Sequence, residues 1–242
     1  MKTYGFGIIG CGMISDFHSA AIADIKNGKL VAVSSRKAEN SQRLVDRYSI
    51  QAYSDYNEML NRDDIDIVCV CTPSGAHMEP AVAAAEAGKH VIIEKPLEIT
   101  LERCDAIIES CEKANVRLCA IFNSRFSDAS QLVKDTVSSG RLGQLTLGDA
   151  YVKWYRSQDY YDSGDWRGTM ELDGGGALMN QSIHAIDFLQ YVMGPVESIQ
   201  AFTDTLAHKR IDVEDVAVAA LRFKNGALGV VEGTTAVYPG SL

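Results

Sequence analysis

The first half of the chain alternates short apolar runs with stretches that have the periodicity of amphipathic helices. An apolar run without polar alternation is typical of a parallel strand that is covered on both faces. The predicted strands are 4–9, 30–35, 52–53, 65–71, 90–93 and 117–122. Helices are predicted between them at 17–26, 41–48, 56–61, 77–87 and 101–114. This order predicts an α/β domain with a doubly wound parallel sheet.

The pattern changes after a further predicted helix at 128–139. Longer strands are predicted at 145–155, 196–204, 213–223 and 227–237. Lys224-Asn225-Gly226 supplies a tight turn between the last two strands. Together with a helix that ends near Met193, they predict an α+β domain with an open, largely antiparallel sheet. We therefore predict two domains, residues 1–122 and residues 123–242.

A glycine-rich turn follows the first predicted strand. Gly10, Gly12 and Ser15 have the spacing of the dinucleotide fingerprint, with serine in the position of the third glycine. Such a turn lets the backbone approach a pyrophosphate, and in this chain Met13 and Ile14 belong to the same stretch of backbone. The helix that follows directs its N–H groups toward the pyrophosphate. The motif by itself is weak evidence, because glycine-rich turns also occur without a ligand. Its place in a strand–helix–strand unit of about 30 residues favours dinucleotide binding.

The residues at the end of the second predicted strand indicate whether the dinucleotide is NAD or NADP. NAD enzymes carry an acidic residue there, which binds the ribose hydroxyls. This chain has Ser35, Arg36 and Lys37 instead, and arginine can bind a 2′-phosphate. A solvated helix start is the alternative, because basic residues are common there and Glu39 is near. We expect NADP as the cofactor, with NAD as the alternative.

Further candidates follow two later strands of the same domain. Thr72-Pro73 ends the strand 65–71, with His77 shortly after it, and Glu94-Lys95-Pro96 ends the strand 90–93. Ligands of doubly wound sheets bind at this carboxyl edge. A lysine there can donate a proton or a hydrogen bond to a reacting oxygen. The alternative is a surface lysine before a turn proline.

A long stretch of the second domain has the character of a binding loop. Residues 160–169 are polar and aromatic and include Tyr160 and Trp166. Arg156 lies just before this stretch and Arg167 lies within it. Arginine binds carboxylates and phosphates through two parallel hydrogen bonds, so both are candidates for an acidic substrate group.

The helix that follows Gly174-Gly175-Gly176 carries a polar stripe. Asn180, His184 and Asp187 are spaced i, i+4 and i+7, so they share one face of an otherwise apolar helix. This stripe predicts the lining of a cleft. The alternative is a single core histidine whose hydrogen bonds are satisfied by its neighbours.

The composition of the chain argues against several kinds of partner and cellular location. The net charge of −9 over 242 residues argues against binding to nucleic acid. No apolar run approaches the ~20 residues of a membrane span, and the charged and apolar regions of a signal peptide are missing. The six cysteines include no CxxC pair, which favours reduced thiols over a zinc site or a disulfide framework. We expect a cytoplasmic protein without a metal and without a membrane partner.

Taken in order, these motifs resemble the glucose–fructose oxidoreductase/inositol dehydrogenase (Gfo/Idh/MocA) family. The resemblance rests on the glycine-rich turn, Thr72-Pro73 with His77, Glu94-Lys95-Pro96, Asn123 with Arg125, and Gly174-Gly175-Gly176 with His184 and Asp187. It implies a Rossmann domain and a sheet domain that packs against another subunit, hence a homodimer or homotetramer. It also implies NAD(P)-dependent hydride transfer at a hydroxyl or carbonyl carbon of a sugar, sugar acid or cyclitol.

The resemblance also implies roles for single residues. Lys95 would contact the substrate oxygen and the nicotinamide region, His184 would act as acid and base, and Asn123 and Arg125 would belong to the substrate site. Many family members carry aspartate where this chain has Asn180, which can orient a neighbour but carries no charge. This variant is similar to the branch that includes nucleotide-sugar-acid dehydrogenases, which makes a sugar acid, including a nucleotide-linked one, a candidate substrate beside a sugar or a cyclitol. Family members continue beyond a strand such as 227–237, and we expect the C-terminal domain to be incomplete here.

The expected reaction places the substrate hydroxyl between Lys95 and His184, one of which removes its proton as hydride passes to the nicotinamide. One alternative is the reduction of non-sugar carbonyls or dihydrodiols, because aromatic side chains also stack on apolar rings. A second alternative is a non-catalytic regulator that binds a dinucleotide. The presence of both Lys95 and His184 counts against the regulator.

Overall fold

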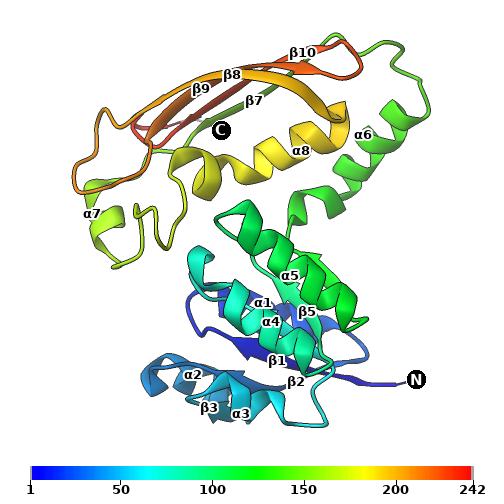
Figure 1. Cartoon of the computed structure of the whole chain (residues 1–242), viewed down its shortest axis with the longest axis vertical. Coiled ribbons are helices and arrows are strands. Elements are labelled where there is room, and N and C mark those ends of the chain that lie inside the picture. The colour runs from blue at the N-terminus through cyan, green and yellow to red at the C-terminus, as the bar shows by residue number, and fades with distance from the viewer. Residues whose placement is uncertain (1, 241–242) are drawn as a thin grey trace. The chain divides into compact units, whose positions relative to one another are not determined.

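The computed structural model describes residues 2–240 of the chain. It divides into two compact units, with the boundary between Ile121 and Phe122 (Figure 1). We refer to these units as the N-terminal and the C-terminal domain.

The N-terminal domain is built on a six-stranded sheet with the strand order β3-β2-β1-β4-β5-β6. Every pair of neighbouring strands runs parallel. The strands are β1 (Tyr4–Ile9), β2 (Gly28–Ser34), β3 (Gln51–Tyr53), β4 (Ile67–Val70), β5 (His90–Ile93) and β6 (Leu118–Ala120). The strand order reverses between β1 and β4, and ligands of doubly wound sheets bind at the carboxyl ends of such strands.

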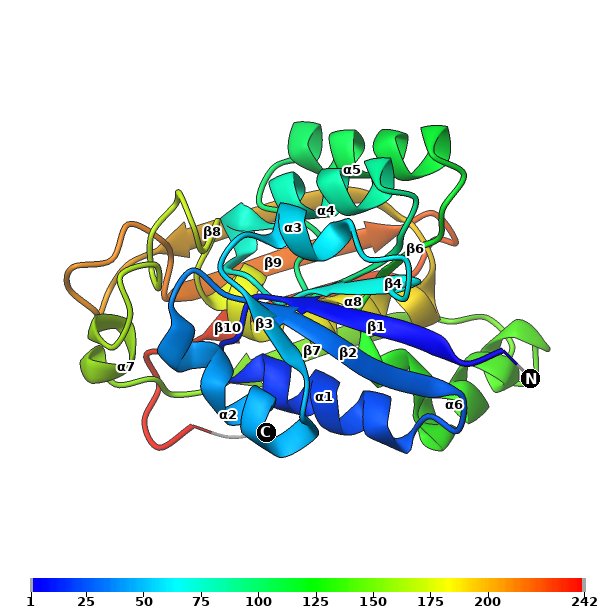
Figure 2. The same ribbon diagram turned by 90° about the horizontal axis from the view of Figure 1, so that it is seen from below.

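Helices cover both faces of this sheet (Figure 2). They are α1 (Ile14–Asp24), α2 (Ala38–Tyr48), α3 (Tyr56–Leu60), α4 (Met78–Glu86) and α5 (Leu101–Lys113), with a short 3₁₀ turn at Ser74–Ala76. α1 and α2 bury Ile22 and Leu44 in one apolar cluster. α3, α4 and α5 contribute Met59, Ala84 and Ile107 to a second cluster. The predicted α/β architecture is confirmed.

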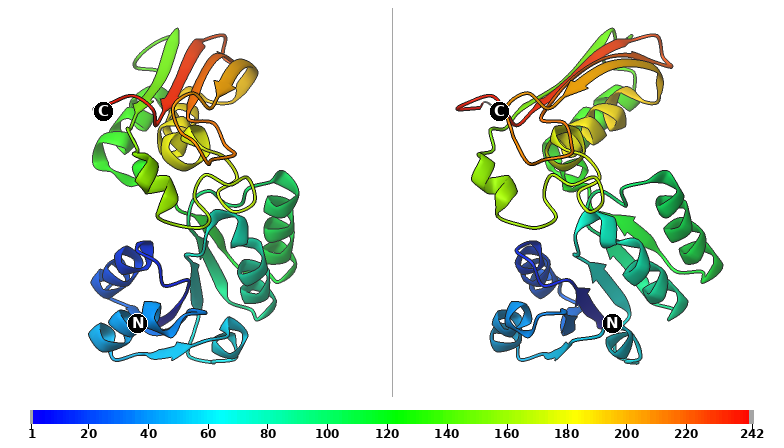
Figure 3. Two further views of the ribbon diagram at one scale, coloured as in Figure 1. Left: turned by 90° about the vertical axis from the view of Figure 1, so that its left-hand side faces the viewer. Right: turned by 60° about the vertical axis from the view of Figure 1, so that its left-hand side comes forward.

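The C-terminal domain contains a four-stranded sheet and helices. The sheet has the order β7-β10-β9-β8, with β7 (Leu147–Lys153), β8 (Val196–Asp204), β9 (Val216–Phe223) and β10 (Leu228–Thr234). The helices are α6 (Asp128–Ser138), α7 (Gln158–Asp162) and α8 (Ile183–Met193), with a 3₁₀ turn at Asn123–Phe126. α8 packs on one face of the sheet and buries Leu189 and Met193 against Ala219 and Phe223 (Figure 3).

One strand pair of this sheet runs against the sequence-based expectation. β10 pairs antiparallel with β9, and β9 pairs antiparallel with β8, but β10 pairs parallel with β7. The prediction of a largely antiparallel sheet is confirmed, and the pairing of β7 is its parallel exception. Alternation of apolar and polar residues reports which face a side chain occupies, and it carries no information on strand direction. A parallel pair needs a long crossover, and the chain between β7 and β10 supplies one.

Two helical segments differ from the prediction in the stretch between β7 and β8. Residues 160–162, which lie in the predicted loop 160–169, belong to the short helix α7. The Ser157 hydroxyl begins this helix by accepting a hydrogen bond from the Tyr160 backbone N–H, as an N-cap residue does. Before α8, residues Ala177–Ser182 form a π-helical turn, whose wider spacing changes the direction of Asn180 relative to His184.

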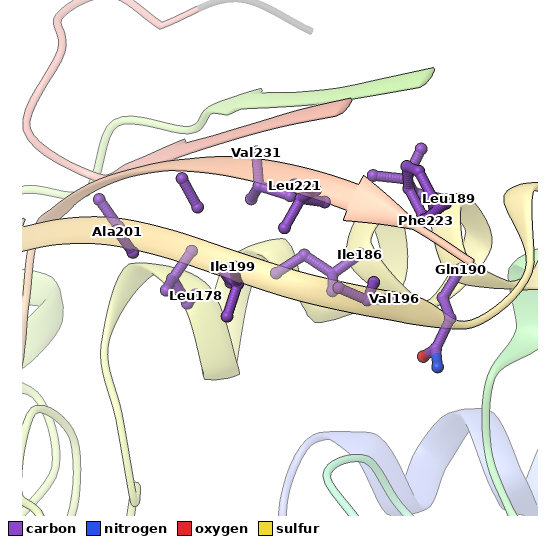
Figure 4. A pocket seen from close by; sticks show the side chains of 12 residues that line it. Leu178, Ile186, Leu189, Gln190, Val196, Ile199, Ala201, Leu221, Phe223 and Val231 are labelled. Carbon is purple, nitrogen blue, oxygen red and sulfur yellow. The ribbon is translucent and has the colours of Figure 1, made fainter. Parts of the chain in front are cut away.

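An apolar cavity of about 390 Å³ lies between α8 and the strands β8 and β9 (Figure 4). Its lining includes Leu178, Ile186, Ile199 and Leu221, and Gln190 is the polar residue among its neighbours. Such a lining offers few hydrogen-bond partners, so a charged or hydroxyl-rich ligand would lose more hydration than it regains. The cavity is therefore not a candidate for the substrate site.

Candidate active site

The glycine-rich turn after β1 has the space that a pyrophosphate requires. Gly10 has a φ of +97°, and a Cβ there would lie 2.6 Å from the Cys71 carbonyl carbon. Around Gly12, a Cβ would meet no atom within 4 Å. Gly10 therefore allows the tight turn next to β4, whereas Gly12 leaves open space for a ligand. The third position holds Ser15, which is fully buried and donates a hydrogen bond to the Gly12 carbonyl oxygen at 2.6 Å.

The backbone at this turn presents unsatisfied donors. No group among residues 2–240 accepts a hydrogen bond from the backbone N–H of Gly12, Met13 or Ile14. α1 begins at Ile14, so its positive dipole end lies at the same place. Open space, N–H donors and the helix dipole together fit a dinucleotide pyrophosphate, whose nicotinamide supplies a hydride acceptor when it is bound. The structure brings the predicted residues Gly10, Gly12, Met13 and Ile14 together here.

The end of β2 carries basic rather than acidic side chains. The Ser35 N–H donates to the Tyr53 carbonyl oxygen at 3.0 Å, and the Lys37 N–H donates to the Ser35 hydroxyl at 3.4 Å. Arg36 is exposed, and no carboxylate of the described residues lies within ion-pair distance of it. Its guanidinium is therefore available to an anion at this edge.

His77 connects the loops that follow β4 and β5. The side chain is buried, with Nε2 3.0 Å from the Thr72 carbonyl oxygen and Nδ1 3.0 Å from the Pro96 carbonyl oxygen. Burial lowers the pKa of His77, and these backbone oxygens oppose that effect. Because both ring nitrogens contact backbone, His77 holds Thr72-Pro73 next to the Glu94-Lys95-Pro96 loop.

Glu94 joins the same loop to α1. Its Oε1 lies 2.8 Å from Nε2 of His18, and its Oε2 accepts a hydrogen bond from the Lys95 N–H at 3.2 Å. Burial acts to raise the pKa of Glu94, but the hydrogen bonds and charges of His18 and Lys95 outweigh it, so the pKa is lowered. The backbone at Lys95 is thus fixed to the helix that begins at the glycine-rich turn.

In the C-terminal domain, a buried carboxylate precedes the polar helix. Asp173 is 1% exposed, and it accepts hydrogen bonds from the Gly168 N–H at 2.9 Å and from the Asn180 side-chain amide. The Asn180 oxygen accepts a hydrogen bond from the Gln181 amide at 3.1 Å. Asp173 thereby fixes the orientation of the Asn180 amide.

The Gln181 amide continues this network to an arginine–aromatic cluster. Its oxygen accepts a hydrogen bond from Arg156 at 2.8 Å, and its nitrogen donates to the Tyr160 hydroxyl at 3.1 Å. The guanidinium carbons of Arg156 and Arg167 lie 5.1 and 4.8 Å from the Tyr160 ring centroid. Arg167 also lies 5.0 Å from the Trp166 ring. We call Arg156, Tyr160 and Arg167 the arginine–tyrosine cluster.

No carboxylate of the described residues forms an ion pair with this cluster. The Nε atoms of Arg156 and Arg167 are buried and have no hydrogen-bond partner among the described residues. Two cations beside one ring repel each other, and a bound anion would remove that repulsion. The cluster therefore fits a carboxylate or phosphate of a substrate.

Arg125 and Asp187, each predicted to belong to the substrate site, form a salt bridge with each other. Arg125 Nε donates to Asp187 Oδ2 at 2.7 Å, and its Nη2 donates to the other oxygen. This bidentate pair joins the turn at 123–126 to α8, and Phe122 lies edge-on to the His184 ring with centroids 6.2 Å apart. Asn123 is exposed at the start of this turn. The pair fixes the face of α8 that carries His184.

The buried pair of His208 and Asp215 holds the backbone of Arg156. His208 Nε2 lies 2.7 Å from the Arg156 carbonyl oxygen, and its Nδ1 lies 2.8 Å from Asp215. Asp215 is fully buried and also accepts hydrogen bonds from backbone N–H groups of residues 206, 207 and 208. The Tyr161 ring packs against His208 with centroids 4.8 Å apart. This arrangement ties the loop 205–215 to the arginine–tyrosine cluster.

Several of these supporting residues were not predicted from the sequence. They are His18, Asp173, Gln181, His208 and Asp215. His18 follows Ile14 by one helical turn, and this polar position could have marked contact with the sheet edge. His208 and Asp215 lie in a loop, where no periodicity marks a buried side chain.

The described residues show no feature of a metal site or a membrane span. Among residues 2–240, no group of three or more His, Cys, Asp or Glu is arranged to hold a metal ion. Within the same range, no helix combines the length and apolar character that a membrane crossing requires. All six cysteines are free thiols, and burial raises the pKa of Cys69 to about 12. The Cys69 thiol is therefore protonated at neutral pH.

Family models match both domains. The model of an oxidoreductase family with an NAD-binding Rossmann fold, GFO/IDH/MocA, matches residues 4–122. The model of the GFO/IDH/MocA C-terminal domain matches residues 130–241. The two matches together cover nearly the whole chain.

Individual relatives extend this similarity. The chain is 34% identical to myo-inositol 2-dehydrogenase of Thermotoga maritima, over 96% of this chain and 69% of that protein. The WlbA dehydrogenase from Bordetella pertussis, in complex with NADH and UDP-GlcNAcA, has a TM-score of 0.95 and 39% identity over 100% of this chain and 73% of that chain. Levoglucosan dehydrogenase, in complex with NADH and levoglucosan, has a TM-score of 0.91 and 28% identity over 98% of this chain and 68% of that chain.

Proposed function

The chain belongs to the GFO/IDH/MocA family of oxidoreductases, and from this premise we propose that it oxidises a hydroxyl group of a nucleotide-linked sugar acid with a nicotinamide dinucleotide. The expected function class, an NAD(P)-dependent oxidoreductase of sugars or cyclitols, agrees with relatives named for inositol and levoglucosan. The sugar acid is the finer part of the proposal. It is supported by the similarity to a dehydrogenase in complex with UDP-GlcNAcA.

The arginine–tyrosine cluster is the observation that supports an acidic substrate. Arg156 and Arg167 both lie against Tyr160, and neither forms an ion pair with a described carboxylate. A neutral cyclitol would leave both charges uncompensated, whereas a uronate or diphosphate would bind them. We assign the cluster to the acidic part of the substrate.

The proposed roles in proton transfer follow from residue type. Lys95 and His184 are the groups that can accept the proton of the substrate hydroxyl. Glu94 and His77 fix the backbone on either side of Lys95. Asn180, oriented by Asp173, positions the substrate next to His184, and the pair of Arg125 and Asp187 supports the same helix. We assign the exposed Asn123 to substrate binding. Trp166 and Tyr160 add aromatic surface for a sugar ring.

The choice between the two dinucleotides depends on Arg36. Ser35 and Arg36 stand where an acidic residue would select NAD, and Arg36 is exposed and without an ion-pair partner among the described residues. We propose that the protein accepts NADP as well as NAD. A ratio of KM values that strongly favours NAD, and that Arg36→Ala leaves unchanged, would contradict this assignment.

We further propose a homodimer or homotetramer that forms through the C-terminal sheet. On the face opposite to α8, Leu147 pairs with Leu228 and Phe202 pairs with Val218. These side chains are 61%, 48%, 78% and 47% exposed, and exposed apolar pairs on one face of a sheet support an interface with another subunit. The two pairs are separate, because Leu228 lies beside Arg222 and Val218 lies beside Glu232. Sedimentation of Phe202→Glu should give a smaller species than wild type. The cytoplasmic location remains a prediction of the sequence.

A substrate panel tests the proposed function. The protein is assayed with UDP-GlcNAcA, UDP-GlcNAc and myo-inositol, each with NAD and with NADP. We expect the highest kcat/KM with the sugar acid. Preferred turnover of myo-inositol would favour a cyclitol dehydrogenase, and dinucleotide binding without turnover of any substrate would favour the non-catalytic regulator.

A further inference from the structure

Arg43 of α2 lies against the glycine-rich turn, although 31 residues separate it from Gly12 in the sequence. Its Nη1 donates to the Cys11 carbonyl oxygen at 3.0 Å, and its Nη2 donates to the Gly12 carbonyl oxygen at 2.7 Å. No role for Arg43 was predicted from the sequence. It reaches the one turn whose backbone must bind the cofactor if the proposed function is correct.

These two carbonyl groups belong to the peptide units that matter most for a pyrophosphate. In a trans peptide, the C=O and the following N–H point in opposite directions. The Cys11 carbonyl shares its peptide plane with the Gly12 N–H, and the Gly12 carbonyl shares its plane with the Met13 N–H. Since both carbonyls point at Arg43, both N–H groups point away from it. They are two of the donors that no described residue satisfies.

The remaining donors of Arg43 are also engaged. Nε donates to both Asp16 oxygens at 3.0 and 3.1 Å, Nη1 also donates to the Asn40 carbonyl oxygen, and Nη2 also donates to the Ser15 hydroxyl at 3.0 Å. A guanidinium has five N–H donors, so none remains for a 2′-phosphate. In this respect Arg43 differs from Arg36, which has no ion-pair partner among the described residues.

We infer that Arg43 is a positioning residue for dinucleotide binding, which orients the Gly12 and Met13 N–H groups toward the pyrophosphate. This inference rests on the proposed binding of a dinucleotide. The pyrophosphate is common to NAD and NADP. Arg43 therefore contributes equally to the affinity for both, and it does not select between them.

The test is a fluorescence titration of the full chain with NADH and with NADPH. We expect Arg43→Met to raise both dissociation constants by the same factor, about tenfold, which is the effect of losing one to two net hydrogen bonds. Arg43→Lys should recover part of the affinity, because lysine keeps the charge but lacks the planar fork. The KM for the sugar substrate at saturating dinucleotide should stay unchanged.

Two controls separate this role from others. Arg47→Met removes an arginine from the same helix, where it lies over the Tyr48 ring, and should leave both affinities unchanged. Arg36→Ala should weaken the binding of NADPH alone.

Asp16→Asn is a second test of the same role, and it replaces Arg43→Met if that variant does not fold. It keeps the guanidinium but weakens its Nε contact, so it should weaken the binding of both dinucleotides by a smaller common factor.

Three outcomes would overturn the inference. Unchanged affinities in a folded Arg43→Met protein would mean that the turn keeps its conformation without the guanidinium. A loss confined to NADPH would make Arg43 a ligand of the 2′-phosphate. If wild type itself bound neither dinucleotide, the proposed function would fail, and the inference would fail with it.

Discussion

His18 on α1 and Glu94 after β5 form a hydrogen-bonded pair, with 2.8 Å between Nε2 and Oε1, although 76 residues separate them. Their side chains are only 10% and 12% exposed. Glu94 also accepts the Lys95 N–H. The pair therefore links the helix that starts at the glycine-rich turn to the loop that carries the candidate catalytic lysine.

This link predicts an effect of His18 on turnover. In His18→Ala, the Lys95 loop loses one anchor, and we expect kcat to fall about tenfold because a catalytic group displaced by a fraction of an ångström loses much of its effect. The dissociation constant for NADH should change little. His18→Gln, which can still donate to Glu94, should recover most of the activity. Equal kcat values for wild type and His18→Ala would contradict the assigned role of the pair.

Lys95 itself should matter for chemistry more than for cofactor binding. We expect Lys95→Ala to lower kcat by about 10²- to 10⁴-fold, the range for removal of an acid–base group. Nicotinamide fluorescence should report nearly unchanged affinity for the dinucleotide. Wild-type turnover by this variant would exclude Lys95 from proton transfer. Lys89→Ala is a matched control, because Lys89 donates to the Arg62 carbonyl oxygen instead.

The two glycines of the turn should respond differently to the same change. Gly10→Ala places a Cβ 2.6 Å from the Cys71 carbonyl carbon at a φ of +97°, so we expect a loss of about 3 kcal/mol in the free energy of unfolding. Gly12→Ala meets no described atom within 4 Å, so it should keep its stability but bind the dinucleotide more weakly. Urea unfolding and NADH titration of both variants measure the two effects. A Gly12→Ala protein with wild-type affinity would argue against the pyrophosphate at this turn.

The arginine–tyrosine cluster predicts selectivity for acidic substrates. Arg156→Met and Arg167→Met should each raise the KM for UDP-GlcNAcA about tenfold, because each removes a charge-assisted contact. Turnover of a neutral sugar should change much less. Arg210→Met is the control, since Arg210 pairs with Asp162 and is 64% exposed. Equal effects on acidic and neutral substrates would assign the cluster a structural role only.

Asp215 predicts a pH-dependent contribution to stability. Burial acts to raise the pKa of Asp215, but hydrogen bonds from residues 206–208, including the His208 ring, outweigh it, so the pKa is lowered. A lowered pKa means that the charged form stabilises the fold above the ordinary aspartate pKa, and that this contribution is lost as the pH falls through the folded-state value. We expect Asp215→Asn to cost about 3 kcal/mol at neutral pH, because asparagine keeps one acceptor oxygen, whereas its NH2 group cannot accept the donors that face the other carboxylate oxygen.

The measurement is urea unfolding of wild type and Asp215→Asn from neutral to acidic pH. The two free energies of unfolding should converge as the pH falls, since wild type then also loses the carboxylate. A difference that stays constant with pH would show that the charge of Asp215 is not what stabilises the loop 205–215.

Local sequence patterns predicted the elements whose environment is uniform along their length. The bounds of β1 (Tyr4–Ile9), β5 (His90–Ile93) and β8 (Val196–Asp204) agree with prediction. In β1 and β5, a continuous apolar run is what burial on both faces requires. The glycine-rich turn was equally predictable, because a tight turn between strand and helix restricts the residue types at each position.

Only the tertiary structure decided the parallel pairing of β7 with β10 and the contacts that support the candidate site. Strand direction depends on how the intervening chain crosses the sheet, and the apolar pattern of β7 is the same for either direction. Arg43 with Gly12, His18 with Glu94, and Asp215 with His208 meet because separate elements converge at a sheet edge or a loop. Hydrogen-bond partners of this kind are set by position in space, whereas the sequence records periodicity and turn chemistry along the chain.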